Sequence, residues 1–115
     1  MLIHYEDRLN QYRSMWIFVY FDLPTETRKE RKVAADFRNN LIKDGFSMFQ
    51  YSIYFRFCPS IENTEVHAKR IRYNLPELGK VCIMKFTDRQ FGMMEVFFGK
   101  KQISNEKPPQ QLEIF

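Results

Sequence analysis

A run of apolar and aromatic residues near the start of the chain predicts its first buried strand. Residues 15–21 read Met-Trp-Ile-Phe-Val-Tyr-Phe, seven consecutive apolar or aromatic residues. This pattern is typical of a strand buried on both faces. Asp22, Leu23 and Pro24 follow directly, so a carboxylate stands where the strand leaves the core, a place where sheet proteins often carry functional groups. Asp before Leu-Pro is also an ordinary loop start, and position alone leaves both interpretations open.

The segment after Pro24 has the pattern of an amphipathic helix. Thr27 and Glu30 have the spacing of a capping box and predict its start. Gly45 predicts its end, as a left-handed C-terminal cap. An apolar stripe recurs at four-residue spacing, and basic residues fall roughly opposite it. The stripe is Val33, Phe37 and Leu41 with Ala34 beside them, and the basic residues are Arg28, Arg31, Lys32 and Arg38.

Two strands and a second helix are predicted next. Residues 46–57 have the pattern of two strands with a tight reversal near Gln50. One face of the second strand is predicted to carry Ile53, Phe55 and Phe57, and the other Ser52, Tyr54 and Arg56. Pro59 and Ser60 predict the start of a helix that runs from Ile61 to about Leu75 and stops at Pro76. Its expected core contacts are Val66, Ile71 and Leu75.

The remaining segments complete an α+β pattern. Strands are predicted at 80–86 and 94–98, a polar linker at 100–109 and a short terminal strand at 110–115. The element order is that of a ferredoxin-like β-α-β-β-α-β sandwich with extra C-terminal strands. We therefore divide the chain into an N-terminal extension (1–14), a ferredoxin-like domain (15–99) and a C-terminal linker with a dimer-crossing strand (100–115).

The predicted sheet leaves one face without cover. Two helices on one side of an antiparallel sheet do not reach the other side. Because this sheet is rich in aromatic residues, we expect a homodimer in which two sheets pack together. The 110–115 segment is then expected to pair with an exposed sheet edge, its own or its partner's.

Composition narrows the function classes. The 115 residues carry a formal net charge of +4 and a pI near 9.1, which favours polyanionic partners. No apolar run is long enough to span a membrane, and the first residues lack the pattern of a signal peptide. Cys58 and Cys82 lack metal-binding spacing, so we expect reduced core thiols in a cytoplasmic protein without a membrane partner.

Several kinds of chemistry have no matching residues in the sequence. There is no candidate Ser or Cys nucleophile with His and Asp, no Walker loop and no RNP octapeptide. His4 and His67 are expected at the surface. The carboxylates expected to be solvated are Asp7, Asp36, Asp44 and Asp88.

Asp22 differs from these acids by its position at a strand end. One carboxylate alone is a poor site for Mg²⁺, which prefers six oxygen ligands and keeps several waters. A two-fold axis near the strand end would bring two copies of Asp22 together. That pair could hold one ion and orient a water toward a scissile phosphate.

The motifs above resemble a known family. Their order is residues 21–24 (Phe-Asp-Leu-Pro), Thr27, residues 30–32 (Glu-Arg-Lys), Phe37-Arg38, Gly45-Phe46 and residues 50–56 (Gln-Tyr-Ser-Ile-Tyr-Phe-Arg). This succession is similar to the second of the two universal CRISPR-associated adaptation proteins. Residues 87–91 (Thr-Asp-Arg-Gln-Phe) and 110–115 (Gln-Gln-Leu-Glu-Ile-Phe) resemble the variants that accompany type II systems. The resemblance covers residues 15–115.

The resemblance implies a ferredoxin-like homodimer that takes part in spacer acquisition. It further implies a metal-dependent endonuclease activity in some members, with Mg²⁺ as the ion and Asp22 as the catalytic and metal-binding residue. The dimer would bridge two dimers of the CRISPR-associated integrase, the first adaptation protein, on double-stranded DNA. Charge and helical position suggest phosphate contacts by Arg28, Arg31, Lys32, Arg38 and Arg56.

Three functions remain open at this point. The first is a Mg²⁺-dependent endonuclease with Asp22 as ligand. The second is a DNA-binding bridge in which catalysis belongs to the integrase. A more distant third is a ferredoxin-like module that binds RNA or senses a metabolite.

Overall fold

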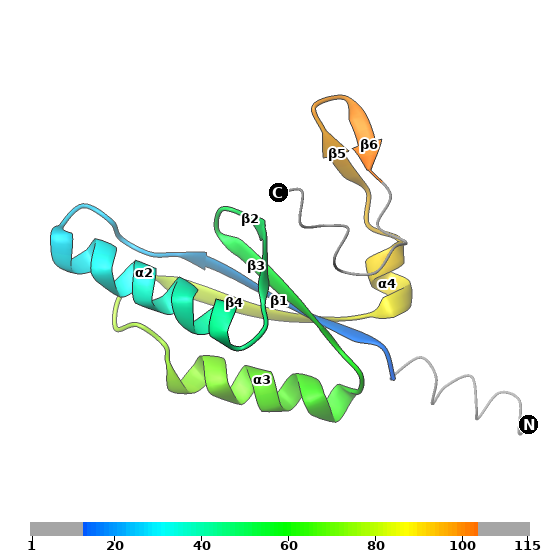
Figure 1. The fold of residues 1–115 in the computed structure, drawn as a ribbon, viewed down its shortest axis with the longest axis horizontal. Helices are drawn as coiled ribbons and strands as arrows, with labels where there is room; N and C mark the ends of the chain where they lie inside the picture. Colours follow the sequence, from blue (N-terminus) through cyan, green and yellow to red (C-terminus); the bar gives the residue numbers. More distant parts are fainter. Residues whose placement is uncertain (1–12, 104–115) are drawn as a thin grey trace, which may run out of the picture.

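The computed structural model describes residues 13–103 (Figure 1). The elements, in chain order, are β1 (Met15–Asp22), α2 (Arg28–Lys43), β2 (Ser47–Gln50), β3 (Ile53–Cys58), α3 (Ile61–Tyr73), β4 (Lys80–Thr87), α4 (Asp88–Gly92), β5 (Val96–Phe98) and β6 (Lys101–Ile103). Most of the predicted extension and the predicted strand at 110–115 lie outside the described residues. Within the described part, no helix is long and apolar enough to cross a membrane.

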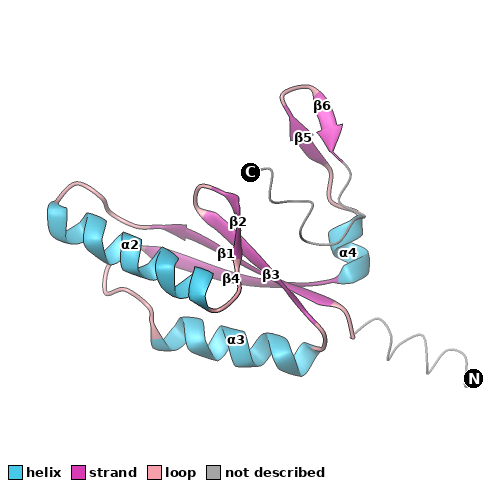
Figure 2. Ribbon diagram, viewed as in Figure 1, coloured by secondary structure: helices cyan, strands magenta, loops and turns pink. Residues whose placement is uncertain are grey.

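Four strands form one antiparallel sheet in the order β2-β3-β1-β4. β1 is central, pairing with β3 from Met15↔Cys58 to Tyr20↔Ile53 and with β4 along its whole length. Helices α2 and α3 lie along the same face of this sheet (Figure 2). The prediction of an α+β, ferredoxin-like fold is therefore confirmed.

The alternation of β1 side chains divides the interior into two clusters. Met15, Ile17, Val19 and Phe21 pack with residues of α2, α3 and β3. Trp16 and Phe18 face the other way, against aromatic residues of β3, β4 and α4. The prediction of a strand buried on both faces is confirmed for every apolar residue of β1 except Tyr20, which is exposed.

The second cluster is dominated by ring contacts. Trp16 stacks on Phe91 of α4, with ring centroids 3.8 Å apart, and its Nε1 donates a hydrogen bond to Asp88 at 2.8 Å. Asp88 was predicted to be a solvated carboxylate, and it is exposed, but it also accepts this bond. Phe18 and Phe55 continue the cluster. Phe18 also lines an apolar hollow of about 290 Å³.

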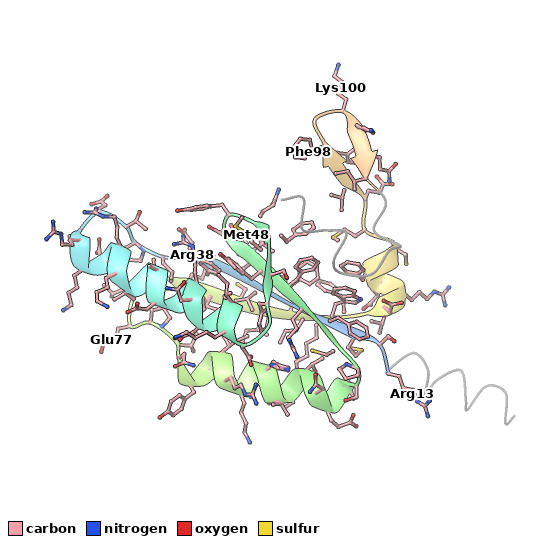
Figure 3. All side chains as sticks on the ribbon, viewed as in Figure 1. Arg13, Arg38, Met48, Glu77, Phe98 and Lys100 are labelled. Atoms are coloured by element: carbon pink, nitrogen blue, oxygen red, sulfur yellow. The ribbon has the colours of Figure 1, made fainter. Side chains whose placement is uncertain are left out.

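Two short elements near the C-terminus were not predicted. Thr87 and Gln90 form a full capping box that starts α4. The Thr-x-x-Gln spacing was a readable signal for a helix start. Gly99 adopts φ 66°, which suits a tight turn. Residues 101–103, predicted to be part of a linker, therefore return as β6 against β5, and this hairpin projects from the sheet with Phe98 and Lys100 at its tip (Figure 3).

The buried faces of the helices differ in part from the predicted ones. α2 begins with the predicted Thr27–Glu30 capping box and buries Ala34, Phe37 and Leu41, but Val33 is exposed. α3 ends at Tyr73, before the predicted end at Leu75. Of the predicted core residues, Val66 and Leu75 are exposed and only Ile71 is buried. The buried stripe of α3 consists of Thr64, His67, Ala68 and Ile71. Its spacing is helical, but two of its members are polar, so hydrophobicity alone selects the wrong face.

Glu65 joins α3 to β4 through Lys85 and also pairs with Arg72 of its own helix. Its carboxylate accepts hydrogen bonds from Lys85 Nζ at 2.8 Å and from Arg72. Hydrogen bonds from Lys85 and then Arg72 lower the pKa of Glu65 from 4.5 to about 2. A carboxylate with a depressed pKa stabilises the folded state above its unfolded pKa, and that contribution is lost as the pH falls toward the folded pKa.

We therefore expect the stability advantage of the native protein over Glu65→Gln to be complete at neutral pH and to shrink between about pH 4.5 and 2. Urea midpoints measured across this range test it. Glu62→Gln is the matched control, because Glu62 lies on the same helix and forms no ion pair within residues 13–103. A stability advantage over Glu65→Gln that is independent of pH would contradict the lowered pKa of Glu65.

Gly79 packs against the backbone that follows β1. It has φ 94°, and a Cβ at this position would lie 2.8 Å from the Asp22 carbonyl oxygen. Gly99 also has a positive φ, but a Cβ there would meet nothing within 4 Å. The two glycines thus share a backbone constraint and differ in their surroundings.

We expect Gly99→Ala to cost about 1 kcal/mol of folding free energy through its positive φ alone. Gly79→Ala should cost at least about 2 kcal/mol, because the methyl group also displaces the Asp22–Leu23 backbone. Urea denaturation of both variants measures the difference. Equal losses would show that the close approach at Gly79 is relieved without strain.

Candidate functional site

The end of β1 presents Asp22 to solvent. Pleating places Asp22 on the same face as Trp16, Phe18 and Tyr20, which is the face that α2 and α3 leave uncovered. Its backbone pairs with Lys80 of β4. The sequence prediction that a carboxylate leaves the core at this strand end is confirmed.

The loop between Asp22 and α2 is fixed by side chains of the helix. Arg31 Nη1 donates to the carbonyls of Thr25 and Glu26 at 3.1 and 3.0 Å. Glu30 Oε1 accepts from the backbone N–H groups of Glu26 and Thr27 at 3.0 and 2.9 Å. The first turn of α2 therefore holds the strand-to-helix connection in one conformation.

A polar hollow of about 470 Å³ lies beside Asp22, and we call it the Asp22 hollow. Of the sequence-predicted site residues, it brings together Asp22, Arg31 and Arg38. Its lining residues are Phe21, Asp22, Leu23, Thr25, Arg31, Ala34, Arg38, Tyr51 and Ser52. One acidic residue, two arginines and two aromatic residues thus border the same opening.

Arg38 lies differently from its prediction. It was expected opposite the apolar stripe, but it flanks that stripe and leaves α2 toward the β2–β3 hairpin (Figure 3). Its guanidinium carbon is 4.7 Å from the ring centroid of Tyr51 and 5.6 Å from that of Phe21. The buried Nε of Arg38 has no hydrogen-bond acceptor among residues 13–103.

The positive charge of Arg38 also reaches Tyr54 behind the hollow. Burial raises the pKa of the Tyr54 hydroxyl, and the nearby Arg38 charge partly opposes this rise. The hydroxyl therefore stays protonated at neutral pH.

Arg28 and Lys32 do not line the Asp22 hollow. Both are exposed on α2, and Lys32 forms an ion pair with Asp36 at 3.2 Å, one turn along the helix. Such an exposed pair contributes little stability and is weakened by salt. These two bases form a separate group from Arg31 and Arg38.

Arg56 takes part in an internal network at the opposite end of α2. Its Nε donates to His67 Nε2 at 3.0 Å, and His67 Nδ1 lies 2.7 Å from Asp44. Asp44 also pairs with Arg70 at 2.5 Å. The predictions of a surface His67 and a solvated Asp44 are wrong, because α3 turns His67 inward against these partners. The structure does not bring Arg56 to the Asp22 hollow.

Cys58 belongs to the same region and is buried, whereas Cys82 is half-buried. Burial raises the pKa of the Cys58 thiol, and the charge of Arg56 and a hydrogen bond from it oppose that rise. Both cysteines are free thiols, as predicted.

Tyr51 lines the hollow but is not among the site residues predicted from the sequence. The available signal was an aromatic residue at a predicted chain reversal, between Gln50 and Ser52. Ser52 explains its placement, because the Ser52 carbonyl accepts a hydrogen bond from Phe21 N–H at 3.0 Å. The β2–β3 turn is thereby tied to the residue before Asp22.

The described residues offer Asp22 as a lone carboxylate ligand at this site. Within residues 13–103, no group of three or more His, Cys, Asp or Glu side chains could hold a metal ion. Mg²⁺ commonly binds through one or two carboxylates, substrate phosphates and water. The donor set therefore fits a cation that is shared with other oxygen ligands and does not fit a closed structural metal site.

Comparison with known proteins gives consistent results. The family model described as CRISPR associated protein Cas2 matches residues 15–94. A protein of Flavobacterium psychrophilum named CRISPR-associated endoribonuclease Cas2 is 68% identical over 112 residues, covering 97% of this chain and 96% of the relative. A protein of the same name from Parvibaculum lavamentivorans is 50% identical over 101 residues, covering 88% of this chain and 100% of the relative.

Proposed function

Because the chain belongs to the CRISPR-associated protein Cas2 family, we propose that it is a metal-dependent endonuclease that hydrolyses phosphodiester bonds in RNA. The relatives compared above carry the name endoribonuclease, which supports RNA as the substrate. The observation that carries the proposal is the exposed Asp22 in one hollow with Arg31 and Arg38.

The two arginines suit a phosphodiester substrate. Guanidinium groups bind phosphate oxygens through several N–H donors and stay charged at any physiological pH. Arg31 also orders the loop beside Asp22 through two carbonyls, so it would both attract the strand and fix the carboxylate's surroundings. Arg38 is free of any ion pair with the described acids, which leaves its charge for a ligand.

Asp22 would hold Mg²⁺ together with Asp22 of a second copy. Its place on the sheet face that α2 and α3 leave uncovered supports this arrangement, because that is where a homodimer partner would pack. When bound, such an ion lowers the pKa of a coordinated water and offsets charge that develops on the phosphate. Asp22 itself orients and retains the ion and transfers no proton in this scheme.

A second function is a double-stranded DNA platform that bridges dimers of the CRISPR-associated integrase during spacer acquisition. The observation that favours it is the separate exposed pair of bases, Arg28 and Lys32, outside the Asp22 hollow. Phosphate contacts of this kind position a duplex without reading its sequence. The two functions use different residues and can coexist in one protein of the cytoplasm.

We expect Asp22→Asn to reduce Mg²⁺-dependent cleavage of single-stranded RNA by at least about a hundredfold, because the charge that holds a hard cation is lost from both protomers. Asp36→Asn is the matched control, since Asp36 is another exposed carboxylate of the chain, and it should cleave at the native rate. Both proteins should retain the native oligomeric state by sedimentation. Native-rate cleavage by Asp22→Asn would reject the assigned site.

The DNA-bridging function predicts a different change. Replacing Arg28 and Lys32 together with Ala should reduce the slope of log affinity against log salt for duplex DNA by about two units, roughly one for each phosphate contact. Lys69→Ala with Arg89→Ala removes the same charge from exposed positions on α3 and α4 and should leave the slope closer to native. Equal slopes for the two double variants would show a general charge effect and no contact surface on α2.

A further inference from the structure

The most exposed aromatic residue beside the candidate site is Tyr51. It lines the Asp22 hollow from the β2–β3 turn, and 72% of its surface is exposed. An aromatic side chain with so little burial contributes little to folding. The turn that carries it is nevertheless fixed, through the bond from Phe21 N–H to the Ser52 carbonyl.

Arg38 supports the Tyr51 ring from one side. The guanidinium lies over the ring at 4.7 Å from its centroid, and Phe21 lies at 5.6 Å from the same guanidinium carbon. Arg38 is therefore held between two aromatic rings, without an acidic partner among residues 13–103. This arrangement leaves both a charge and an aromatic surface at the mouth of the hollow.

We propose that Tyr51 is a stacking platform for one unpaired nucleobase of the substrate strand, with Arg38 contacting the adjoining phosphate next to Asp22. This inference rests on the proposed function and adds to it a preference for single-stranded over double-stranded substrate. A nucleobase can stack on the exposed face of Tyr51, because every base presents a π face of suitable size. The Asp22 hollow, at about 470 Å³, lies within the usual range of small-ligand pockets, about 300–1,000 Å³.

The platform selects single strands over duplexes. In a duplex each base is already stacked and paired, so placing one on Tyr51 requires that it be unstacked first. A single strand does not meet this cost. Tyr51 is thus a specificity residue, whereas Asp22 acts on the phosphodiester group.

Binding measurements with the Asp22→Asn protein test the platform without cleavage. A labelled short oligoribonucleotide, single-stranded or annealed to its complement, is titrated with this protein and with versions that also carry Tyr51→Ala or Tyr51→Phe. Removal of the ring should weaken single-strand binding by roughly tenfold. Tyr51→Phe retains the ring and should stay within about twofold, and duplex binding should change little in either variant.

An abasic strand locates the effect on a base. When one nucleotide in turn lacks its base, one position should weaken binding to the Asp22→Asn protein. The strand that lacks this base should bind the Tyr51→Ala version no more weakly than the intact strand does. The missing base and the missing ring are the two sides of one contact, so removing both costs no more than removing one. The platform is rejected if Tyr51→Ala and Tyr51→Phe bind alike, if duplex binding falls equally, or if the two losses simply add. Single-strand binding that behaves as expected, together with no cleavage by the native protein, would reject the nuclease and leave the platform in place.

Discussion

The rest of this structure depends on the double pairing of β1. β1 is hydrogen-bonded on both edges, to β3 and to β4, and its alternating side chains supply both interior clusters. Met15, Ile17, Val19 and Phe21 anchor the helices, while Trp16 and Phe18 anchor the aromatic face. A strand that is paired on both edges and buried over most of its length has little freedom to shift its register. Its last residue is consequently placed with the precision of the core.

That placement explains why a functional group can stand at Asp22. The carboxylate is exposed, but its backbone pairs with Lys80 of β4 and is closely approached by the preceding residue, Gly79. The arginines beside it come from a helix whose first turn also orders the connecting loop. Asp22 and the arginines beside it are thus carried by rigid elements, although their charged groups are open to solvent. A site that must receive a charged polymer benefits from this combination, because little ordering remains to be done on binding.

The sequence was sufficient for the elements whose signals are local. The apolar run of β1, the Thr27–Glu30 capping box and Gly45 each predict a feature that the structure contains. It was insufficient for α3, because the buried position of His67 depends on Asp44 and Arg56, which lie far away in the sequence. Hydrophobic periodicity cannot anticipate a polar residue that is buried through such partners.

The candidate site could likewise be predicted only in part. Asp22 could be predicted from its place after a buried run, and the basic character of α2 from composition alone. The sequence could not predict which basic residues lie beside Asp22. This depends on the rotation of α2 about its axis and on the turn that brings Tyr51 over Arg38. Arg28 and Arg38 are alike in charge, and their different positions along and around α2 separate their surroundings.

The contact of Trp16 with α4 has a spectroscopic consequence. Trp16 is the sole tryptophan of the sequence, and it is 3% exposed, stacked on Phe91 and hydrogen-bonded to Asp88. The intrinsic indole emission of the protein therefore arises entirely from the aromatic face of the sheet and not from the side covered by α2 and α3. If α4 moves away from the sheet, the surroundings of Trp16 become more polar and its emission changes. This change can be measured separately from the melting of the helices, which circular dichroism follows.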